Sequence, residues 1–331
     1  MEKDFDVIAL GELLIDMTDN GTTQSGNTLF EANPGGAPCN VLAMLRKLGR
    51  RVAFIGKVGD DIFGHGLKRI LSEVGIDTEN LTIDHEARTT LAFVQNFEDG
   101  DRDFSFYRNP GADMMLRKED IHVPILQNTR IFHFGTISMT HQEVREATKY
   151  AVEKAKSAGA LISFDPNIRE PLWDSMEVAK EQVLWGLSKC DILKISDNEI
   201  QWLTGKKDFS EGVQEIRKTY RIPLILVSMG KDGSRAYYKP SVCGGEEFMV
   251  EARPFIQKNT IETTGAGDTF GGCVLHAVLD KDLNHLTEQD LMEMLQFANA
   301  AASIITTRKG ALRVMPEKEE VLELMKSVRN G

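Results

Sequence analysis

The sequence has few cysteines, no long hydrophobic run and no excess of positive charge. Its four cysteines form neither a Cys-x-x-Cys pair nor a cluster with histidine, which argues against a disulfide framework and a zinc site. No apolar run approaches the ~18 residues that a membrane-spanning helix needs. The net charge of −11, without a basic tail or stripe, argues against nucleic-acid binding. Since the N-terminus is polar and lacks a signal peptide, we expect a cytoplasmic protein with neither a membrane nor a nucleic acid as partner.

Short apolar strands alternate with helical patterns along most of the chain. Strands are expected at 7–10, 52–55, 131–134, 161–164, 192–195 and 224–227, with antiparallel edge strands at 235–238 and 248–250. Helices are expected after Gly35, from about Asp61, at 143–158, from Asp197, and at about 268–280, 288–307 and 317–328. This alternation predicts an α/β fold with a mostly parallel sheet and helices on both faces.

Two segments interrupt the alternation. Residues 13–34 are polar and could form a long loop or a pair of short strands, whereas 89–97 and 104–107 flank a polar turn and predict a β-hairpin. Strands that pair locally do not belong to a parallel series, so we expect a small accessory sheet that acts as a lid. The predicted large domain comprises 1–12, 35–87 and 113–331, and the predicted inserted lid comprises 13–34 and 88–112.

The stretch from Thr263 to Phe270 places two glycines and an aspartate immediately before a helical pattern. The first amides of a helix have no internal partner and favour an anion, so Gly265, Ala266 and Gly267 form a candidate phosphate cradle. Asp268 could then accept a proton from an alcohol that attacks the bound phosphoryl group. The alternative is an ordinary helix start with an acidic first turn, and the tetrapeptide alone does not exclude it.

Several polar segments directly follow predicted strands. They are Gly11, 165–169, Ser196, 228–233 and the turn at Gly265. Because ligands bind beyond the carboxyl ends of parallel strands, we expect these segments to line one crevice.

Three motifs together resemble the signatures of the ribokinase-like (PfkB) family of carbohydrate kinases. They are Gly35 to Asn40, Val58 to Gly64 and Thr263 to Phe270, and the resemblance extends from Asp6 to about Pro316. The segments 106–114, 164–173 and 228–234 resemble the fructokinase subgroup. The resemblance implies a three-layer, doubly wound α/β/α fold with a small β-sheet lid. It also implies transfer of the γ-phosphoryl group of ATP to the 6-hydroxyl of D-fructose.

The same resemblance implies a role for individual residues. Asp268 would be the base, Gly265, Ala266 and Gly267 the anion hole, and Arg169 a source of positive charge. The implied sugar-binding residues are Asp16, Gly35, Gly36, Asn40, Phe104, Phe106, Arg108 and Asn167. The implied nucleotide-binding residues are Ser196, Ser228, Gly230, Gly233 and Asn299.

The resemblance further implies metal ions and a subunit partner. Glu199 would order Mg²⁺ through water, although Ser196 stands where the family often has asparagine. Glu262, Thr264 and Gly310 would lie at a K⁺ site; Glu262 stands where aspartate is common, which leaves the K⁺ dependence open. An apolar side of the lid, formed by Leu91, Phe93, Phe104 and Phe106, predicts a homodimer through the lid.

Other functions remain open at this stage. Within the family they are kinases of 2-keto-3-deoxygluconate, ribose or a nucleoside. A nicotinamide dehydrogenase would use Gly265, Gly267 and Gly271 as a dinucleotide fingerprint, but the spacing is wrong by one residue and the motif comes late in the chain. A non-catalytic sugar sensor on the same fold is a further alternative, which the presence of Asp268 disfavours. The sequence contains no P-loop motif.

Overall fold

The computed structural model describes residues 3–96, 102–240 and 247–329. These residues contain a nine-stranded sheet in the order β13-β12-β11-β10-β9-β8-β1-β4-β5. Its strands are β1 (Phe5–Leu10), β4 (Val52–Gly59), β5 (Leu81–Asp84), β8 (Thr129–Gly135), β9 (Leu161–Asp165), β10 (Ile192–Ser196), β11 (Leu224–Ser228), β12 (Ser234–Tyr238) and β13 (Phe248–Ala252). All neighbours pair in parallel except β12 and β13, which form the antiparallel edge that the sequence predicts.

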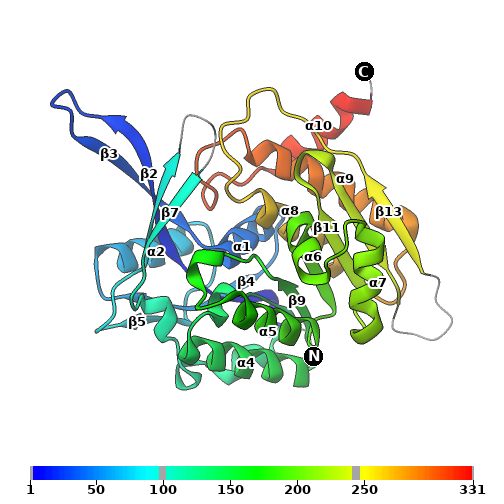
Figure 1. Cartoon of the computed structure of the whole chain (residues 1–331), viewed down its shortest axis with the longest axis horizontal. Coiled ribbons are helices and arrows are strands. Elements are labelled where there is room, and N and C mark those ends of the chain that lie inside the picture. The colour runs from blue at the N-terminus through cyan, green and yellow to red at the C-terminus, as the bar shows by residue number, and fades with distance from the viewer. Residues whose placement is uncertain (1–2, 97–101, 241–246, 330–331) are drawn as a thin grey trace.

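Helices cover both faces of this sheet (Figure 1). On one face lie α1 (Ala37–Lys47), α2 (Ile62–Glu73), α8 (Ala266–Leu279), α9 (Glu288–Ile305) and α10 (Lys318–Arg329). On the other lie α3 (Val123–Gln127), α4 (Gln142–Ser157), α5 (Met176–Leu187), α6 (Asp197–Thr204) and α7 (Phe209–Thr219). Short 3₁₀ turns occur at Ala112–Met115, Lys118–Asp120, Ile137–Met139, Glu170–Leu172 and Gly230–Asp232.

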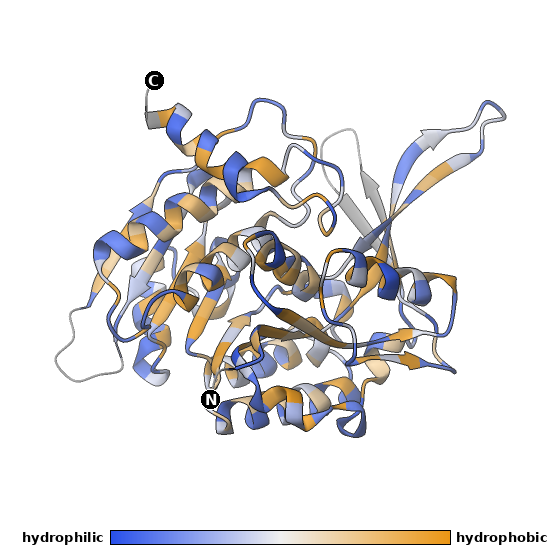
Figure 2. Cartoon of the chain, turned by 180° about the vertical axis from the view of Figure 1, so that it is seen from behind, coloured by the Kyte–Doolittle hydropathy of each residue, from blue (hydrophilic) through white to orange (hydrophobic). Residues whose placement is uncertain are grey.

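The central strands are apolar on both sides, as a parallel sheet covered by helices requires. In β1, Val7 and Ala9 pack in one core cluster, while Ile8 and Leu10 pack in the other. Figure 2 shows these apolar strands inside the molecule, with hydrophilic residues on the outward sides of the helices. The predicted three-layer α/β/α architecture is therefore confirmed. None of the helices in the described ranges is long and apolar enough to cross a membrane.

A second, four-stranded sheet lies beside the large one, with the order β3-β2-β6-β7. It consists of β2 (Leu14–Thr22), β3 (Thr28–Gly35), β6 (Leu91–Asn96) and β7 (Arg102–Tyr107), and in Figure 1 the β2–β3 hairpin projects from the body of the molecule. The polar segment 13–34 is thus a pair of strands, not a long loop. The turn expected at 98–103 lies largely outside the described residues.

The register of this small sheet corrects one expectation. Leu91 pairs with Tyr107 and Ala92 pairs with Phe106, so Leu91 and Phe93 lie on the opposite face from Phe106. Side chains alternate between the two faces of a strand, and four residues at these positions cannot form one apolar side. Since Ala92 in turn pairs with Asp16, the face that carries Phe106 is also the face of Asp16.

The order of strands explains where a ligand can bind. The chain passes from β1 to β4 on one side, and later strands continue from β8 on the other side of β1. The direction of winding therefore changes at β1, and doubly wound sheets bind ligands in the crevice at such a point. Glu12 and the start of the small sheet follow β1 directly, so both lie at this crevice.

Candidate active site

A hollow of about 500 Å³ lies between the small sheet and the carboxyl ends of the large one. It is lined by residues from β2, the start of α1, the loop after β9 and the start of α8. The predicted residues that line it are Asp16, Gly35, Gly36, Asn40, Phe106, Asn167, Arg169, Glu262, Thr264, Gly265, Gly267, Asp268 and Gly310. The fold therefore brings together segments that are up to nearly three hundred residues apart. Of the five segments expected in one crevice, the loop at 165–169 and the turn at Gly265 line this hollow, whereas Gly11, Ser196 and 228–233 are not among its described lining residues.

A second hollow, of about 360 Å³, lies on the other side of the Gly265 turn. Its lining includes four predicted nucleotide-binding residues and two residues of the phosphate cradle: Ser228, Gly230, Gly233, Asn299, Ala266 and Gly267. Thr263 and Gly267 line both hollows. The start of α8 is therefore the place where a group held in one hollow can reach a molecule held in the other.

The start of α8 is open to both hollows because glycine forms its cap. Gly265 has a φ of 76°, in the left-handed region that favours glycine, and a Cβ there would lie 2.6 Å from the Ala311 Cβ. Within the described ranges, no side chain forms a capping hydrogen bond at this end of the helix. The amides of Gly267 and Asp268 lie in the first turn, where a helix supplies no acceptor for them. Together with the helix dipole they form a site suited to an anion.

Asp268 points toward α1 and is held by Asn40. The Asn40 Nδ2 donates to the Asp268 Oδ2 at 2.8 Å. Burial raises the pKa of Asp268 above its usual value, while the hydrogen bond from Asn40 and the charges of Lys194 and Arg169 oppose this increase. The Oδ1 of Asn40 is buried and has no hydrogen-bond partner among the residues that the structure describes. A buried oxygen without a partner is costly, and a ligand hydroxyl in the hollow would satisfy it.

Two glycines allow Asp16 and α1 to approach the hollow closely. A Cβ at Gly35 would lie 2.3 Å from the Asp16 Oδ2, and a Cβ at Gly36 would lie 2.4 Å from the backbone oxygen of Glu12. Gly36 also has a φ of 132°. Burial raises the pKa of Asp16 to about 7; the charge of Arg169 opposes the increase, and those of Glu262 and Asp268 add to it. Asp16 is thus a carboxylate that titrates near neutral pH.

Comparison with known proteins agrees with this geometry. The sequence profile described as "pfkB family carbohydrate kinase" matches residues 4–318. The chain belongs to the pfkB family of carbohydrate kinases. Members of this family phosphorylate sugars, so the chain is a sugar-phosphorylating enzyme, as the resemblance of its motifs implies.

Individual members of the pfkB family are similar over nearly the whole chain. "Probable fructokinase-2" of Arabidopsis thaliana is 42% identical over 322 residues, which cover 97% of this chain and 95% of that protein. A crystal structure of fructokinase with bound ATP from Xylella fastidiosa superposes with a TM-score of 0.86 and 31% identity, covering 98% of this chain and 99% of that one. A fructokinase double mutant from Vibrio cholerae, with fructose, ADP and potassium ion bound, has a TM-score of 0.83 and 28% identity, covering 98% and 100%.

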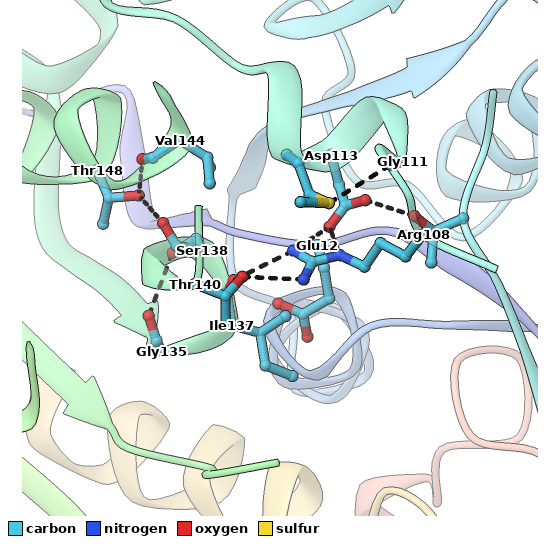
Figure 3. Close-up of polar contacts among 12 residues, drawn as sticks. Glu12, Arg108, Gly111, Asp113, Gly135, Ile137, Ser138, Thr140, Val144 and Thr148 are labelled. Carbon is cyan, nitrogen blue, oxygen red and sulfur yellow. Dashed lines mark hydrogen bonds and ion pairs between the residues drawn. The ribbon is translucent and has the colours of Figure 1, made fainter. Parts of the chain in front are cut away.

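Some predicted residues of this pfkB-family kinase lie outside the two hollows. Arg108 is buried beside η1 (Ala112–Met115), and its guanidinium contacts Asp113 at 2.7 and 2.8 Å and the Thr140 Oγ1 at 2.9 Å (Figure 3). Arg108 is not among the described residues that line the 500 Å³ hollow, so the structure does not bring it to the predicted sugar site. The side chain of Phe104 lies outside the described part of the chain.

Ser196 and Glu199 also lie apart from the two hollows, and they form a capping box at the start of α6. Both the backbone amide and the Oγ of Ser196 donate to the Glu199 Oε2 at 2.8 Å. The Oε1 of Glu199 accepts a bond from the Ile168 amide at 2.8 Å. Through these hydrogen bonds, Ser196 and Glu199 connect the end of β10 to the loop after β9, which carries Asn167 and Arg169.

Two further predicted residues line a hollow but use their polar groups within the protein. The Asn299 amide nitrogen donates to the backbone oxygens of Ala252 and Arg253, and its oxygen accepts from the Ser234 Oγ. The Glu262 Oε1 accepts from the Gly310 amide at 2.6 Å. Glu262 thus joins the two loops that the resemblance assigns to a K⁺ site.

Sequence reasoning missed two charged residues of the first hollow. Glu12 accepts a bond from the Ala37 amide at 2.8 Å, and burial raises its pKa to about 7. Lys194 projects from β10, and its Nζ lies 2.9 Å from the Asp165 Oδ2. A signal for each exists, because Glu12 directly follows the first strand and Lys194 is the one charged residue in an apolar strand.

Proposed function

We propose that the protein is an ATP-dependent fructokinase that phosphorylates the 6-hydroxyl of D-fructose. One observation carries the proposal: Asp268 stands at an uncapped helix start where a sugar-sized hollow and a second hollow meet. The fructokinase names of the similar proteins support fructose as the sugar, and the ATP-bound relative supports ATP as the donor.

The residues of the site suggest how the reaction proceeds. Fructose occupies the first hollow, surrounded by Asp16, the backbone at Gly35 and Gly36, Phe106 and Asn167. The Asn40 Oδ1 accepts a hydrogen bond from one of its hydroxyl groups. Asp268 takes the proton of the 6-hydroxyl as that oxygen bonds to the γ-phosphorus and the bond from phosphorus to the ADP oxygen breaks. The amides of Gly267 and Asp268, which the turn at Gly265 and Ala266 presents, stabilise the charge on the transferring group. The Ala266 amide itself donates to the Thr263 backbone oxygen at 3.2 Å. Arg169 supplies positive charge nearby.

The second hollow holds the nucleotide in this proposal. Ser228, Gly230 and Gly233 form the loop beside the phosphates and ribose. The side chain of Asn299 fixes the backbone of Ala252 and Arg253, so it shapes the wall of the base site. Ser196 acts indirectly, since its hydrogen bonds orient Glu199.

Two ions fit the residues present. The described residues hold no group of three His, Cys, Asp or Glu side chains suited to a metal ion, so Mg²⁺ would be carried by the ATP phosphates, as is usual for this ion. Glu199, with a lone pair remaining on Oε1, would hold one of its waters. Backbone oxygens of the loops at Glu262 to Thr264 and at Gly310 would hold K⁺. Bound Mg²⁺ would neutralise charge on the transferring phosphoryl group.

The substrate is tested by initial rates with ATP and Mg²⁺ on a panel of sugars. We expect the highest kcat/KM for fructose, with product phosphorylated at the 6-position by ³¹P NMR. A rate on ribose, 2-keto-3-deoxygluconate or adenosine far above that on fructose would overturn the choice of sugar. Sugar binding without turnover of any of them would instead indicate a non-catalytic sensor. The fructokinase names of the relatives do not favour these alternatives.

The raised pKa of Asp16 predicts a pH-dependent affinity for fructose. With a pKa of about 7 in the free protein, Asp16 is mostly protonated at pH 6 and mostly ionised at pH 8. If the ionised form accepts sugar hydroxyls, titration calorimetry should show binding about tenfold tighter at pH 8 than at pH 6. The stability of the free protein should change in the opposite direction: a raised carboxyl pKa stabilises the fold below the unfolded value of about 4, and this stabilisation is lost as the pH rises through 7.

The Asp16→Asn variant is the control for this prediction, because asparagine does not titrate. Its fructose affinity should be weaker than that of the wild type at pH 8 and should vary little between pH 6 and pH 8. An equal pH dependence in the wild type and the variant would assign the effect to another group, of which Glu12 is the nearest in pKa.

The outer face of the small sheet supports a homodimer. Phe93 contacts Phe30 and Tyr107, with ring centroids 5.2 and 5.1 Å apart, and Phe30 and Tyr107 are 45% and 67% exposed. We propose that 13–34 and 88–112 act as one inserted lid and that two lids pair through this face. A monomer mass in sedimentation at micromolar protein would refute the dimer.

The free, buried thiols of Cys39, Cys190 and Cys273 support a reducing, cytoplasmic location.

A further inference from the structure

The central residue of β10, Lys194, extends its side chain into the active site, close to the phosphate cradle. Lys194 lines the 500 Å³ hollow, and only 13% of its side chain is exposed. A Cβ placed on Gly267 would lie 3.2 Å from the Lys194 Nζ. Since Gly267 lines both hollows, this ammonium group stands at the point where they meet.

The ammonium group remains charged in this enclosed position. Burial alone would lower the pKa of Lys194, but the charges of Asp165, Glu199 and Asp268 raise it above the usual value. An ammonium group has three donors, and the described contacts use one of them, toward the Asp165 Oδ2 at 2.9 Å. Lys194 therefore has donors left for an anion in the hollow.

Asp165 is suited to hold this lysine. It ends β9, which pairs with β10, and it is 5% exposed. Its Oδ2 contacts Lys194, whereas its Oδ1 is buried and has no hydrogen-bond partner in the described part of the chain. A buried ion pair with an unsatisfied oxygen adds little to stability, because the desolvation of the charges offsets their attraction. Packing alone therefore does not explain why an ion pair occupies this position.

We propose that Lys194 is a catalytic residue that contacts the transferring phosphoryl group and that Asp165 positions it. The proposal rests on the proposed kinase function of the same site. During transfer, negative charge on the three outer phosphoryl oxygens moves from the nucleotide side of Gly267 to the sugar side. The Lys194 ammonium group lies beside Gly267, where the phosphoryl group passes between the hollows. It donates a hydrogen bond to one of these oxygens from the side opposite the amides of α8. Charge-assisted hydrogen bonds of this kind are about twice as strong as neutral ones.

The test is Lys194→Met, which keeps the length and apolar stem of the side chain. We expect kcat to fall by about 10²–10³-fold, the size found when one transition-state donor is removed, with the Kd for sugar changed by less than about threefold. Lys194→Arg should recover part of the loss. Lys218→Met is the matched control, because among the described residues Lys218 forms an exposed ion pair with Glu215 and lines neither hollow, so its kcat should equal that of the wild type.

Two further measurements separate phosphoryl contact from a structural role. Replacing ATP by ATPγS changes one outer oxygen to sulfur, so the rate ratio of ATP to ATPγS should be smaller in Lys194→Met than in the wild type. Asp165→Asn, which keeps the lysine but releases it, should lower kcat by about tenfold and leave that ratio nearer the wild-type value. Assays use whichever sugar the wild type phosphorylates fastest, so an error in the choice of fructose does not affect the outcome. A kcat for Lys194→Met within threefold of the wild type, or an unchanged ATPγS ratio, would overturn the proposal.

Discussion

Replacing Asp268 by asparagine is expected to lower kcat by about 10²–10⁴-fold, the range that a positioned general base contributes. The change preserves the shape of the side chain and leaves an oxygen that can accept the hydrogen bond from the Asn40 Nδ2. The amide cannot take the proton of the 6-hydroxyl, so the loss should be in the chemical step. Binding of the sugar should persist, because Asp16 and the α1 glycines are unchanged.

This result is measured by steady-state rates together with titration calorimetry of fructose binding. Glu288→Gln is the matched control: Glu288 is also an acidic residue in the first turn of a helix, α9, but it is exposed and lies outside both hollows. Its kcat should be unchanged. A kcat for Asp268→Asn within threefold of the wild type would remove Asp268 from the role of base.

Replacing Arg108 by methionine is expected to lower the free energy of unfolding by about 3–5 kcal/mol, since it leaves the Asp113 carboxylate buried without its partner. The two side chains are 4% and 2% exposed, and Asp113 also accepts a bond from Thr90 at 2.5 Å. Figure 3 shows the Arg108 guanidinium between Asp113 on one side and Thr140 on the other. The folded fraction should bind fructose with nearly the affinity of the wild type.

Denaturant unfolding followed by fluorescence measures this loss, with Arg69→Met as control. Arg69 and Glu73 form an exposed pair on α2, so the control should change the free energy by less than about 1 kcal/mol. If Arg108→Met kept its stability but raised the KM for fructose by tenfold or more, Arg108 would be the sugar-binding residue that its motif suggests.

Arg108 illustrates what a sequence motif leaves open. The segment from Phe106 to Met114 places Arg108 five residues before Asp113, and the sequence alone does not tell whether the arginine pairs with that acid or with a ligand. The pairing depends on β7 ending at Tyr107 and on the turn at Ala112–Met115, which bring the two side chains together. Phe106, two residues earlier, faces the hollow because of its register with Ala92.

The elements of the large sheet could be predicted because their signals are local. The start of α8 follows from two glycines and an apolar helical repeat, and the structure places it at Ala266. By contrast, the sequence pattern does not predict the helix at 176–187, which forms α5. Its buried residues include Gln182 and Gly186, and Val178, Leu184 and Trp185 are partly buried on other sides, so no single apolar stripe marks the helix.

Lys194 could not be assigned from the sequence for a different reason. A lysine within an apolar strand indicates a special environment, but only the three-dimensional arrangement gives its partner and its distance from α8. Asp165 precedes it by twenty-nine residues and Gly267 follows by seventy-three, and both lie close to its ammonium group. This part of the site is formed by contacts between neighbouring strands and between the sheet and a helix. Such contacts leave no pattern in the local sequence.

The most direct measurement is a crystal structure of the protein with fructose and a non-hydrolysable ATP analogue. The account predicts the 6-hydroxyl of fructose at about 2.6–3.2 Å from the Asp268 carboxylate. It also predicts the terminal phosphate of the analogue on the amides at the start of α8. Fructose bound with this hydroxyl turned away from Asp268, or a terminal phosphate remote from Gly267, would contradict it.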